Sequence, residues 1–167
     1  MNHQSEQNKN SSLITAVIER NSKVLAKLLG RGLDINAPDQ DGKTALIHAA
    51  SRGHSEAVAL LVVHQANIEA KDNNTYTPLM WAALNGDIDT LKLLIKSGAN
   101  IQAITAYGVT ALMLAAMKGH TLAVDVLVQN GALLEVKADN GFDALQFAEQ
   151  EGMFDTIALI KTHLPEY

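Results

Sequence analysis

The sequence predicts an all-α repeat protein in which similar helical units stack side by side. The first observation behind this prediction is a fixed period, because one short motif recurs four times at intervals of 33 residues. The second is the spacing of apolar residues inside each copy, which fits two short helices per unit. A constant period of this length indicates stacked supersecondary units rather than one closed globular core.

Four positions keep the same register through the copies. They are Thr44, Thr77, Thr110 and Asp143; Leu46, Leu79, Leu112 and Leu145; Ala49, Ala82, Ala115 and Ala148; and Gly53, Gly86, Gly119 and Gly152. A degenerate copy precedes them, in which Ser11, Leu13 and Ala16 keep the register while Arg20 replaces the glycine. The chain is therefore expected to hold about five repeats, the outer two being degenerate caps.

The register also sets the expected boundaries of the domain. A disordered polar tail is expected over 1–10, a repeat domain over 11–163 and a short tail over 164–167. In the last repeat the first helix carries polar residues, and Pro165 follows this repeat. Both features favour a solenoid that is complete and monomeric, because polar end faces oppose end-to-end association and proline opposes continuation of a helix. The five repeats are placed at about 11–38, 39–71, 72–104, 105–137 and 138–163.

The copy that begins near residue 39 shows the expected helices most clearly. A first helix over about 45–52 turns its leucine and paired alanines to one side, at about 100° per residue, and turns His48 and Arg52 to the other. Gly53 then ends this helix, because glycine adopts the left-handed conformation at little cost. A second helix is expected over about 55–64, where apolar side chains form one broad face.

Between the helix pairs the chain is expected to form a turn, an apolar anchor and a projecting finger. Glycine, asparagine and aspartate follow each second helix and tolerate the positive φ of a turn. The anchors are Ile35, Ile68, Ile101 and Leu134. The tips of the hairpin-like fingers are Asp41-Gly42, Asn74-Thr75, Tyr107-Gly108 and Asn140-Gly141.

The recurring heptads closely resemble the ankyrin repeat. They read Thr-Ala-Leu-Ile-His-Ala-Ala (44–50), Thr-Pro-Leu-Met-Trp-Ala-Ala (77–83) and Thr-Ala-Leu-Met-Leu-Ala-Ala (110–116), and Gly-His or Gly-Asp follows each. The resemblance covers nearly everything from Ser11 to His163. It implies a β-turn and two antiparallel helices per repeat, stacked into a curved solenoid that binds other proteins.

This chain departs from the family pattern at the histidine of Thr-Pro-Leu-His. In the family that histidine links hydrogen bonds with the threonine and between repeats. Apolar packing is therefore expected to hold this seam instead. The residues at that position are Ile47, Met80, Met113 and Gln146.

Composition narrows the classes of partner. The formal net charge is −5 and lysine and arginine do not cluster, which opposes nucleic-acid binding. No apolar run approaches the roughly 20 residues of a membrane span, and residues 1–10 lack the apolar stretch of a secretory signal. Cysteine is absent, which excludes disulfides. A cytoplasmic protein is favoured, although export by a signal-independent route stays open.

Function must come from the surface, because a fold alone does not assign one. Outward positions of the first helices form rows across the copies, and the finger tips adjoin them. These rows and tips are expected to form a concave face that binds a partner protein. The candidate partner-binding residues are Asp41, Lys43, His48, Arg52, Asn74, Tyr76, Trp81, Leu84, Asn85, Tyr107, Val109, Leu114, Met117, Lys118 and Phe142.

Most aromatic residues fall in these rows and fingers. Aromatic side chains are enriched at the energetic centres of protein interfaces, so we hypothesise an apolar patch that receives the partner. The alternative is that Trp81, Leu114 and Phe147 pack between neighbouring first helices while the tyrosines stiffen the finger tips. The five aromatic residues concerned are Tyr76, Trp81, Tyr107, Phe142 and Phe147.

No metal, cofactor or catalytic site is expected. Zinc needs three or four converging ligands at short spacings, and the six histidines show no such pattern. Catalysis needs a nucleophile with a base, or paired carboxylates, in a concave pocket. Asp39, Asp41 and Asp72 are instead expected to satisfy backbone amides in turns.

Two functions without catalysis stay open. One is an adaptor that holds a protein without altering it. The other is an inhibitor that covers the active surface of a partner enzyme, with the acidic balance of the chain steering a basic partner.

Overall fold

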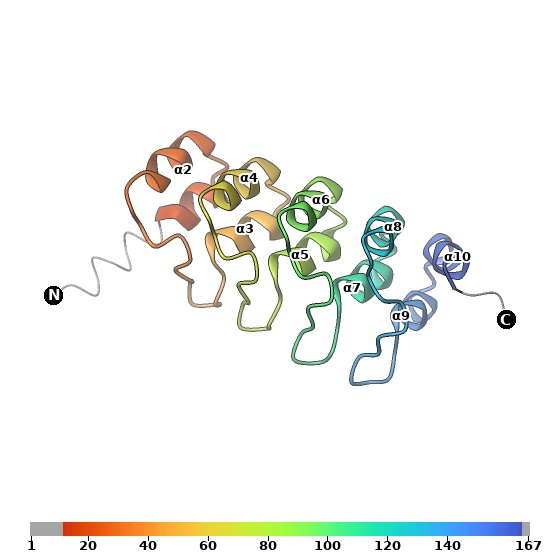
Figure 1. The fold of residues 1–167 in the computed structure, drawn as a ribbon. Coiled ribbons are helices and arrows are strands. Elements are labelled where there is room, and N and C mark those ends of the chain that lie inside the picture. Colours follow the sequence, from red (N-terminus) through yellow and green to blue (C-terminus); the bar gives the residue numbers. More distant parts are fainter. Residues whose placement is uncertain (1–11, 165–167) are drawn as a thin grey trace.

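The computed structural model describes residues 12–164 as a row of helix pairs from which loops project (Figure 1). β-type pairing within these residues is limited to an isolated bridge between Ile104 and Thr110, so the predicted all-α class is confirmed. The expected tail over 1–10 and residues 165–167 lie outside the described residues. After a helical segment at 12–18 come α2 (Ser22–Leu29), α3 (Ala45–Ser51), α4 (Ser55–Val63), α5 (Pro78–Asn85), α6 (Ile88–Lys96), α7 (Ala111–Met117), α8 (Thr121–Gln129), α9 (Ala144–Gln150) and α10 (Phe154–Thr162).

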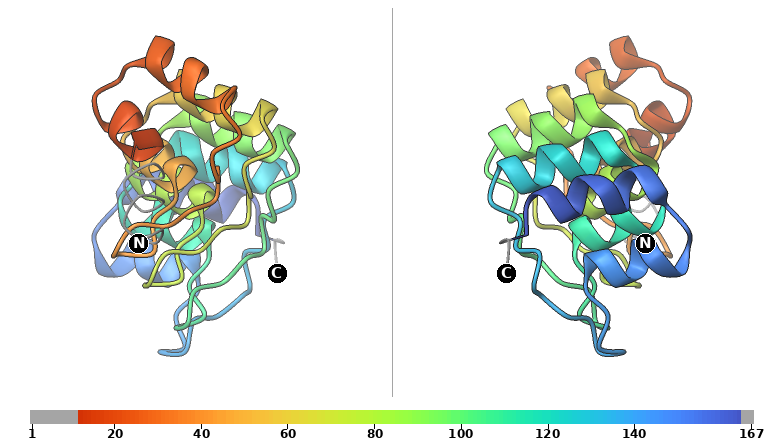
Figure 2. Two further views of the ribbon diagram at one scale, coloured as in Figure 1. Left: turned by 90° about the vertical axis from the view of Figure 1, so that its left-hand side faces the viewer. Right: turned by 90° about the vertical axis from the view of Figure 1, so that its right-hand side faces the viewer.

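The helices form two layers. The first helices α3, α5, α7 and α9 pack side by side in one layer, and the second helices α2, α4, α6, α8 and α10 form the other (Figure 1). Each first helix also packs against the second helix of its own repeat. The end views show the second helices running nearly parallel, with the fingers extending away from both layers (Figure 2).

Small side chains let the first helices approach closely. The paired alanines of α3, α5 and α7 have no exposed surface, and the motif leucines beside them are at most 1% exposed. The second helices contribute Leu61, Leu94, Leu127 and Ile160, each 0% exposed. Burying a side chain of this size contributes about 1.5–3 kcal/mol, so one continuous apolar seam holds the repeats together.

The last repeat exposes what the inner repeats bury. Leu145 and Ile157 are only partly buried, whereas their counterparts one repeat earlier, Leu112 and Val124, are buried. No described helix packs beyond them. An ion pair of 3.5 Å between Lys161 and Glu149 joins α10 to α9 at this end.

Side chains of the motif cap the first helices. The Thr77 hydroxyl accepts from the Met80 N–H (3.3 Å), and the Met80 sulfur accepts from the Thr77 N–H (3.5 Å). Thr110 and Met113 repeat this arrangement at 3.2 and 3.4 Å. Methionine thus replaces the family histidine as a weak local acceptor, while its fully buried chain packs in the seam.

A left-handed corner follows each first helix. The recurring glycines there have φ between 63° and 69°, and Arg20 adopts φ 54° at the same place in the first repeat. The next repeat sets one residue directly above each inner corner. A Cβ built on Gly86 would lie 2.6 Å from the His120 ring, whereas one on Gly152 would meet nothing within 4 Å.

Alanine substitutions at these two corners are expected to separate backbone strain from steric exclusion. Gly152→Ala costs only the left-handed conformation of a non-glycine residue, about 1–2 kcal/mol. Gly86→Ala costs the same strain and also displaces His120, for roughly a further 1–3 kcal/mol. Denaturant unfolding of the two variants measures the difference, and equal losses would contradict this account of the corner.

Candidate functional site

Each finger begins as a tight hairpin organised around one side chain. The Asp39 N–H donates to the Lys43 carbonyl at 3.0 Å, and the Asp72 N–H donates to the Tyr76 carbonyl at 3.1 Å. One carboxylate oxygen of Asp72 accepts from the Asn74 and Tyr76 N–H groups, at 3.0 and 2.9 Å. Asp39 Oδ1 likewise accepts from the Asp41 and Lys43 N–H groups, each at 2.9 Å. The expectation that aspartates satisfy turn amides is therefore confirmed for Asp39 and Asp72, whereas Asp41 contributes its N–H.

The second carboxylate oxygen ties the finger to the first helix. His48 Nε2 lies 2.6 Å from Asp39 Oδ2, and Trp81 Nε1 donates to Asp72 Oδ2 at 2.9 Å. In both repeats the ring stands nine residues after the aspartate. We call this contact the finger–helix clasp. It holds the finger at a fixed place relative to the helix that begins after it.

The clasp has no polar counterpart in the last two repeats. Thr105 still organises its finger, since its hydroxyl accepts from the Tyr107 and Val109 N–H groups (3.3 and 3.1 Å). The residue nine positions later is Leu114, which cannot donate. The last repeat has Ala138 and Phe147 at these positions, and Phe147 packs edge-on against Phe142 with centroids 5.6 Å apart.

Two of the predicted surface residues are buried, so their expected exposure is wrong. His48 is 6% exposed and Leu114 is 2% exposed, so neither side chain offers a surface to a partner. Helical periodicity placed both on the outward side of their helices. At His48 the finger of the same repeat reaches that side through the clasp, and helix periodicity alone cannot predict this contact. Leu114 belongs to the apolar core.

Hydrogen bonds fix the proton on His48. Arg52 Nη1 lies 2.7 Å from His48 Nδ1 and can only donate, so Nδ1 accepts and Nε2 carries the proton donated to Asp39. Burial alone would raise the pKa of Asp39. The hydrogen bonds from His48, from the Lys43 N–H and from the Asp41 N–H outweigh burial and hold that pKa below its ordinary value.

An aromatic cluster lies where the finger of one repeat meets its first helix. The Tyr76 and Trp81 rings have centroids 5.3 Å apart, and Lys43 Nζ lies 4.4 Å from the centroid of the Trp81 ring. The lysine belongs to the preceding finger, so the contact bridges two repeats. Both rings remain partly exposed. Trp81 is thus a structural residue and a surface residue at once.

Adjacent fingers are joined at their tips. The Asn73 N–H donates to the Asp41 carbonyl and the Asp139 N–H to the Tyr107 carbonyl, each at 3.0 Å. Between these two junctions, the Ala106 N–H donates to the Thr75 hydroxyl at 2.7 Å. Thr75 has φ 64° where the sister fingers have glycine. A β-branched residue rarely adopts this conformation, so the bond to the next finger helps to hold it.

The other predicted residues remain at least partly exposed. We call the surface they form the finger–helix surface. Tyr107 is 72% exposed at the tip of its finger. The remaining members at the fingers and on the first helices are Asp41, Lys43, Arg52, Asn74, Tyr76, Trp81, Leu84, Asn85, Val109, Met117, Lys118 and Phe142.

Sequence reasoning missed the clasp and the finger junctions. Asp39 and Asp72 were interpreted as turn residues alone, and the nine-residue spacing to a ring nitrogen donor was the available signal. The signal for Thr75 was a non-glycine residue at a position where three sister fingers have glycine. No pattern in the sequence indicated which neighbouring backbone group it would bind.

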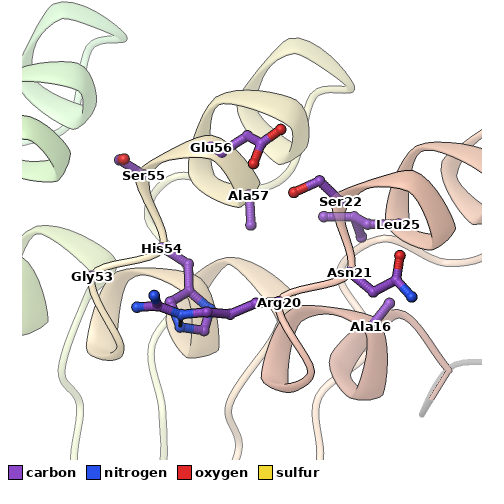
Figure 3. Close-up of a pocket in the computed structure, with 10 residues that line it drawn as sticks. All are labelled: Ala16, Arg20, Asn21, Ser22, Leu25, Gly53, His54, Ser55, Glu56 and Ala57. Carbon is purple, nitrogen blue, oxygen red and sulfur yellow. Dashed lines mark hydrogen bonds between the residues drawn. The ribbon is translucent and has the colours of Figure 1, made fainter.

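A separate cavity of about 170 Å³ lies between the first two repeats (Figure 3). Its lining includes Arg20, Asn21, His54 and Glu56, together with alanine, serine and glycine residues whose small side chains do not fill the space. Ligand pockets usually measure about 300–1,000 Å³, so this cavity is small for a bound molecule. It lies at the repeat junction, away from the finger–helix surface.

Arg20 and His54 hold this junction together. His54 Nδ1 lies 2.9 Å from the Val17 carbonyl, and Arg20 Nε donates to His54 Nε2. The histidine must therefore be neutral, with its proton on Nδ1. His120 makes a similar contact to the Leu84 carbonyl at 3.1 Å, so two histidines of the motif each join their repeat to the preceding one.

These features define a helical-repeat solenoid whose fingers and first helices present one continuous surface. A family model for three ankyrin repeats matches residues 13–105, and a model for a single ankyrin repeat matches residues 107–139. The chain belongs to the ankyrin repeat family. Ankyrin repeats generally mediate protein–protein interaction and are typically not enzymes. No curated protein sequence gives a significant match to the chain.

Metal-ligand clusters and membrane-spanning helices are both absent among residues 12–164. No group of three or more His, Asp or Glu side chains in this part of the chain could hold a metal ion. None of the helices described there is long and apolar enough to cross a membrane.

Breaking one clasp is expected to cost stability. Trp81→Phe keeps the ring but removes its N–H, which leaves an oxygen of Asp72, a residue only 4% exposed, without this donor and costs about 1–3 kcal/mol. Asp72→Ala also destabilises the protein. The double variant should lose less than the sum of the two single losses, because both remove one contact. Additive losses in denaturant unfolding would show that the clasp carries no coupling energy.

Acidification is expected to weaken the junction between the first two repeats. Burial and the charge of Arg20 lower the pKa of His54 below its ordinary 6.5. The neutral ring is the form that the folded state prefers. Its contribution is therefore complete above the unfolded pKa and is lost as the pH falls through 6.5 toward the folded pKa.

The measurement compares the wild-type chain with His54→Gln, which keeps a donor and an acceptor but does not titrate. The difference in their free energies of unfolding should be smaller at pH 5.5 than at pH 7.5. A difference that does not change with pH would contradict this role of His54.

Proposed function

We propose that this protein binds a partner protein through the finger–helix surface and acts without catalysis. The observation that carries the proposal is the exposure of three aromatic side chains, Tyr76, Trp81 and Tyr107, on a hydrogen-bonded framework. Tyr107 is 72% exposed at a tip fixed by hydrogen bonds to its neighbours, and Trp81 is fixed by its clasp. Aromatic side chains held in one orientation lose little entropy on binding, which favours an interface centred on them.

The dimensions of the surface fit such a role. Repeats spaced by about 8–10 Å give a face roughly 30–40 Å long over the four first helices. A standard protein interface covers about 800 Å² on each partner. In this proposal the protein is a monomer in the cytoplasm. It acts either as an adaptor or as an inhibitor of its partner.

A photo-cross-linking amino acid at residue 107 is expected to capture the partner from extracts of the cells that make this protein. The matched control carries the same group at residue 154, because Phe154 is 82% exposed on α10, away from the fingers. Tyr107→Ser should reduce partner recovery in a pull-down at least tenfold, and Phe154→Ser should leave it unchanged. Both variants should keep the wild-type melting curve. Equal cross-linking at the two positions would overturn the proposal.

If the captured partner is an enzyme, its activity in the presence of this protein separates an inhibitor from an adaptor.

A further inference from the structure

The middle of the finger–helix surface is cationic, although the chain as a whole is acidic. The first helices end in a row of exposed residues that runs Glu19, Arg52, Asn85, Lys118 and Glu151. Its two ends are acidic and its two central charges are positive. Lys43 adds a third positive charge at the base of a finger. Whole-chain charge, which is −5, therefore gives the wrong sign for the centre of this surface.

These three cations have no acidic partner among the described residues. Among residues 12–164, Lys161 and Glu149 form an ion pair, and the contact between His48 and Asp39 joins a neutral ring to a carboxylate. Lys43 lies over the Trp81 ring, and Arg52 donates to a neutral histidine nitrogen. None of the three cations takes part in an ion pair among these residues.

Two aspartates of this surface are occupied by bonds within their own repeats. One oxygen of Asp39 accepts from two backbone N–H groups and the other from His48. Both oxygens of Asp72 are engaged in the same manner, with Trp81 as the ring donor. Asp39 and Asp72 therefore organise their fingers, and Asp41 is an exposed acid at a finger tip. The surface also presents Lys43, Arg52 and Lys118 near an apolar floor that includes Trp81, Leu84 and Met117.

We propose that the partner offers a segment that carries carboxylates on either side of an aromatic or branched apolar residue. This inference rests on the proposed function and names the chemistry of its partner. The apolar residue packs on the floor between Trp81 and Met117, and the carboxylates pair with Lys43, Arg52 and Lys118. A carboxylate at Lys43 also lies beside the ring that this lysine covers, where partial desolvation strengthens the ion pair.

The spacing of the cations sets the length of the segment. Arg52 and Lys118 stand two repeats apart, which is roughly 16–20 Å at the usual distance between packed helices. An extended chain covers this distance in about five or six residues, and a helix in about eleven to thirteen. A library of 12-residue peptides therefore contains candidates in either conformation.

A structural role for Arg52 and Lys118 is the competing explanation. Each occupies the C-terminal cap of its helix, α3 or α7, where a cation stabilises the helix dipole. The same position in α9 is Glu151, so the fold accepts an acidic residue there. Charge reversal at this position is therefore a practical test, and a melting curve measures the structural contribution separately.

The test selects random 12-residue peptides displayed on phage against three full-length proteins. These are the wild type, the variant Arg52→Glu/Lys118→Glu, and the control Lys92→Glu/Lys96→Glu. Both lysines of the control are exposed on α6, outside the finger–helix surface. Each double variant changes the net charge by −4, from −5 to −9, so the overall charge is matched.

We expect the wild type and the Lys92/Lys96 control to select peptides enriched in Asp and Glu around an apolar residue. The Arg52/Lys118 variant should lose this enrichment or select basic peptides. The best acidic peptide, measured by fluorescence anisotropy in 50 mM salt, should bind the Arg52/Lys118 variant at least tenfold more weakly than the wild type. The control should differ from the wild type by less than twofold. Emission of Trp81, the one tryptophan in the chain, should change on binding.

Three results would overturn the inference. Selected peptides without acidic enrichment that still lose binding on Tyr107→Ser would retain the proposed function and refute the acidic partner. Acidic peptides that bind the Arg52/Lys118 variant as tightly as the wild type would refute the three cations as the site. Selection of no peptide above the unselected library would count against both the surface and its chemistry.

Discussion

The close contact between neighbouring first helices is the constraint on which the rest of this structure depends. Paired alanines in α3, α5 and α7 bring these helices together without exposed apolar surface. Once the helices are so close, the residue that opens each second helix lies over the corner of the preceding repeat. That geometry requires glycine at Gly86, where a Cβ would meet His120. The same stacking sets the fingers side by side, within reach of hydrogen bonds between their tips.

Functional and structural roles overlap at the clasp. Asp72 organises the backbone of its finger with one oxygen and holds Trp81 with the other. Trp81 in turn supports Tyr76 and lies beneath Lys43 of the preceding finger. An interface built in this way is preorganised, because the same bonds that stabilise the fold fix the side chains that a partner would meet. The last two repeats have no such bond between finger and helix, and in the last repeat Phe147 packs against Phe142 of the finger instead.

Three residues show that the solenoid imposes its backbone on positions that glycine usually fills. Arg20, Gln65 and Thr75 all have positive φ where sister repeats have glycine. Each conformation costs a non-glycine residue about 1–2 kcal/mol. Arg20 bonds His54, and Thr75 bonds the next finger, so two of these residues gain contacts that glycine could not make. Nothing in the structure gives Gln65 a comparable contact.

The sequence by itself determined the class of fold, the register and the two layers of helices. The first helix expected over 45–52 is α3 at Ala45–Ser51, and the second expected over 55–64 is α4 at Ser55–Val63. These features follow from local periodicity and a constant repeat length, both of which can be recognised in the sequence alone. The methionine substitutions likewise predicted an apolar seam, and Met80 and Met113 are buried there.

Tertiary structure alone decided which outward positions of the first helices stay exposed. His48 and Leu114 share a helical face with Trp81, yet the first two side chains are buried and the tryptophan stays partly exposed. The position of a finger depends on side-chain bonds such as that between Asp39 and His48, and helix periodicity carries no information about a loop folded over the helix.

The cationic centre of the surface also results from the tertiary structure. Arg52 and Lys118, 66 residues apart in the chain, lie in one row because the repeats stack, and Asp39 and Asp72 are occupied by bonds that only the folded chain forms.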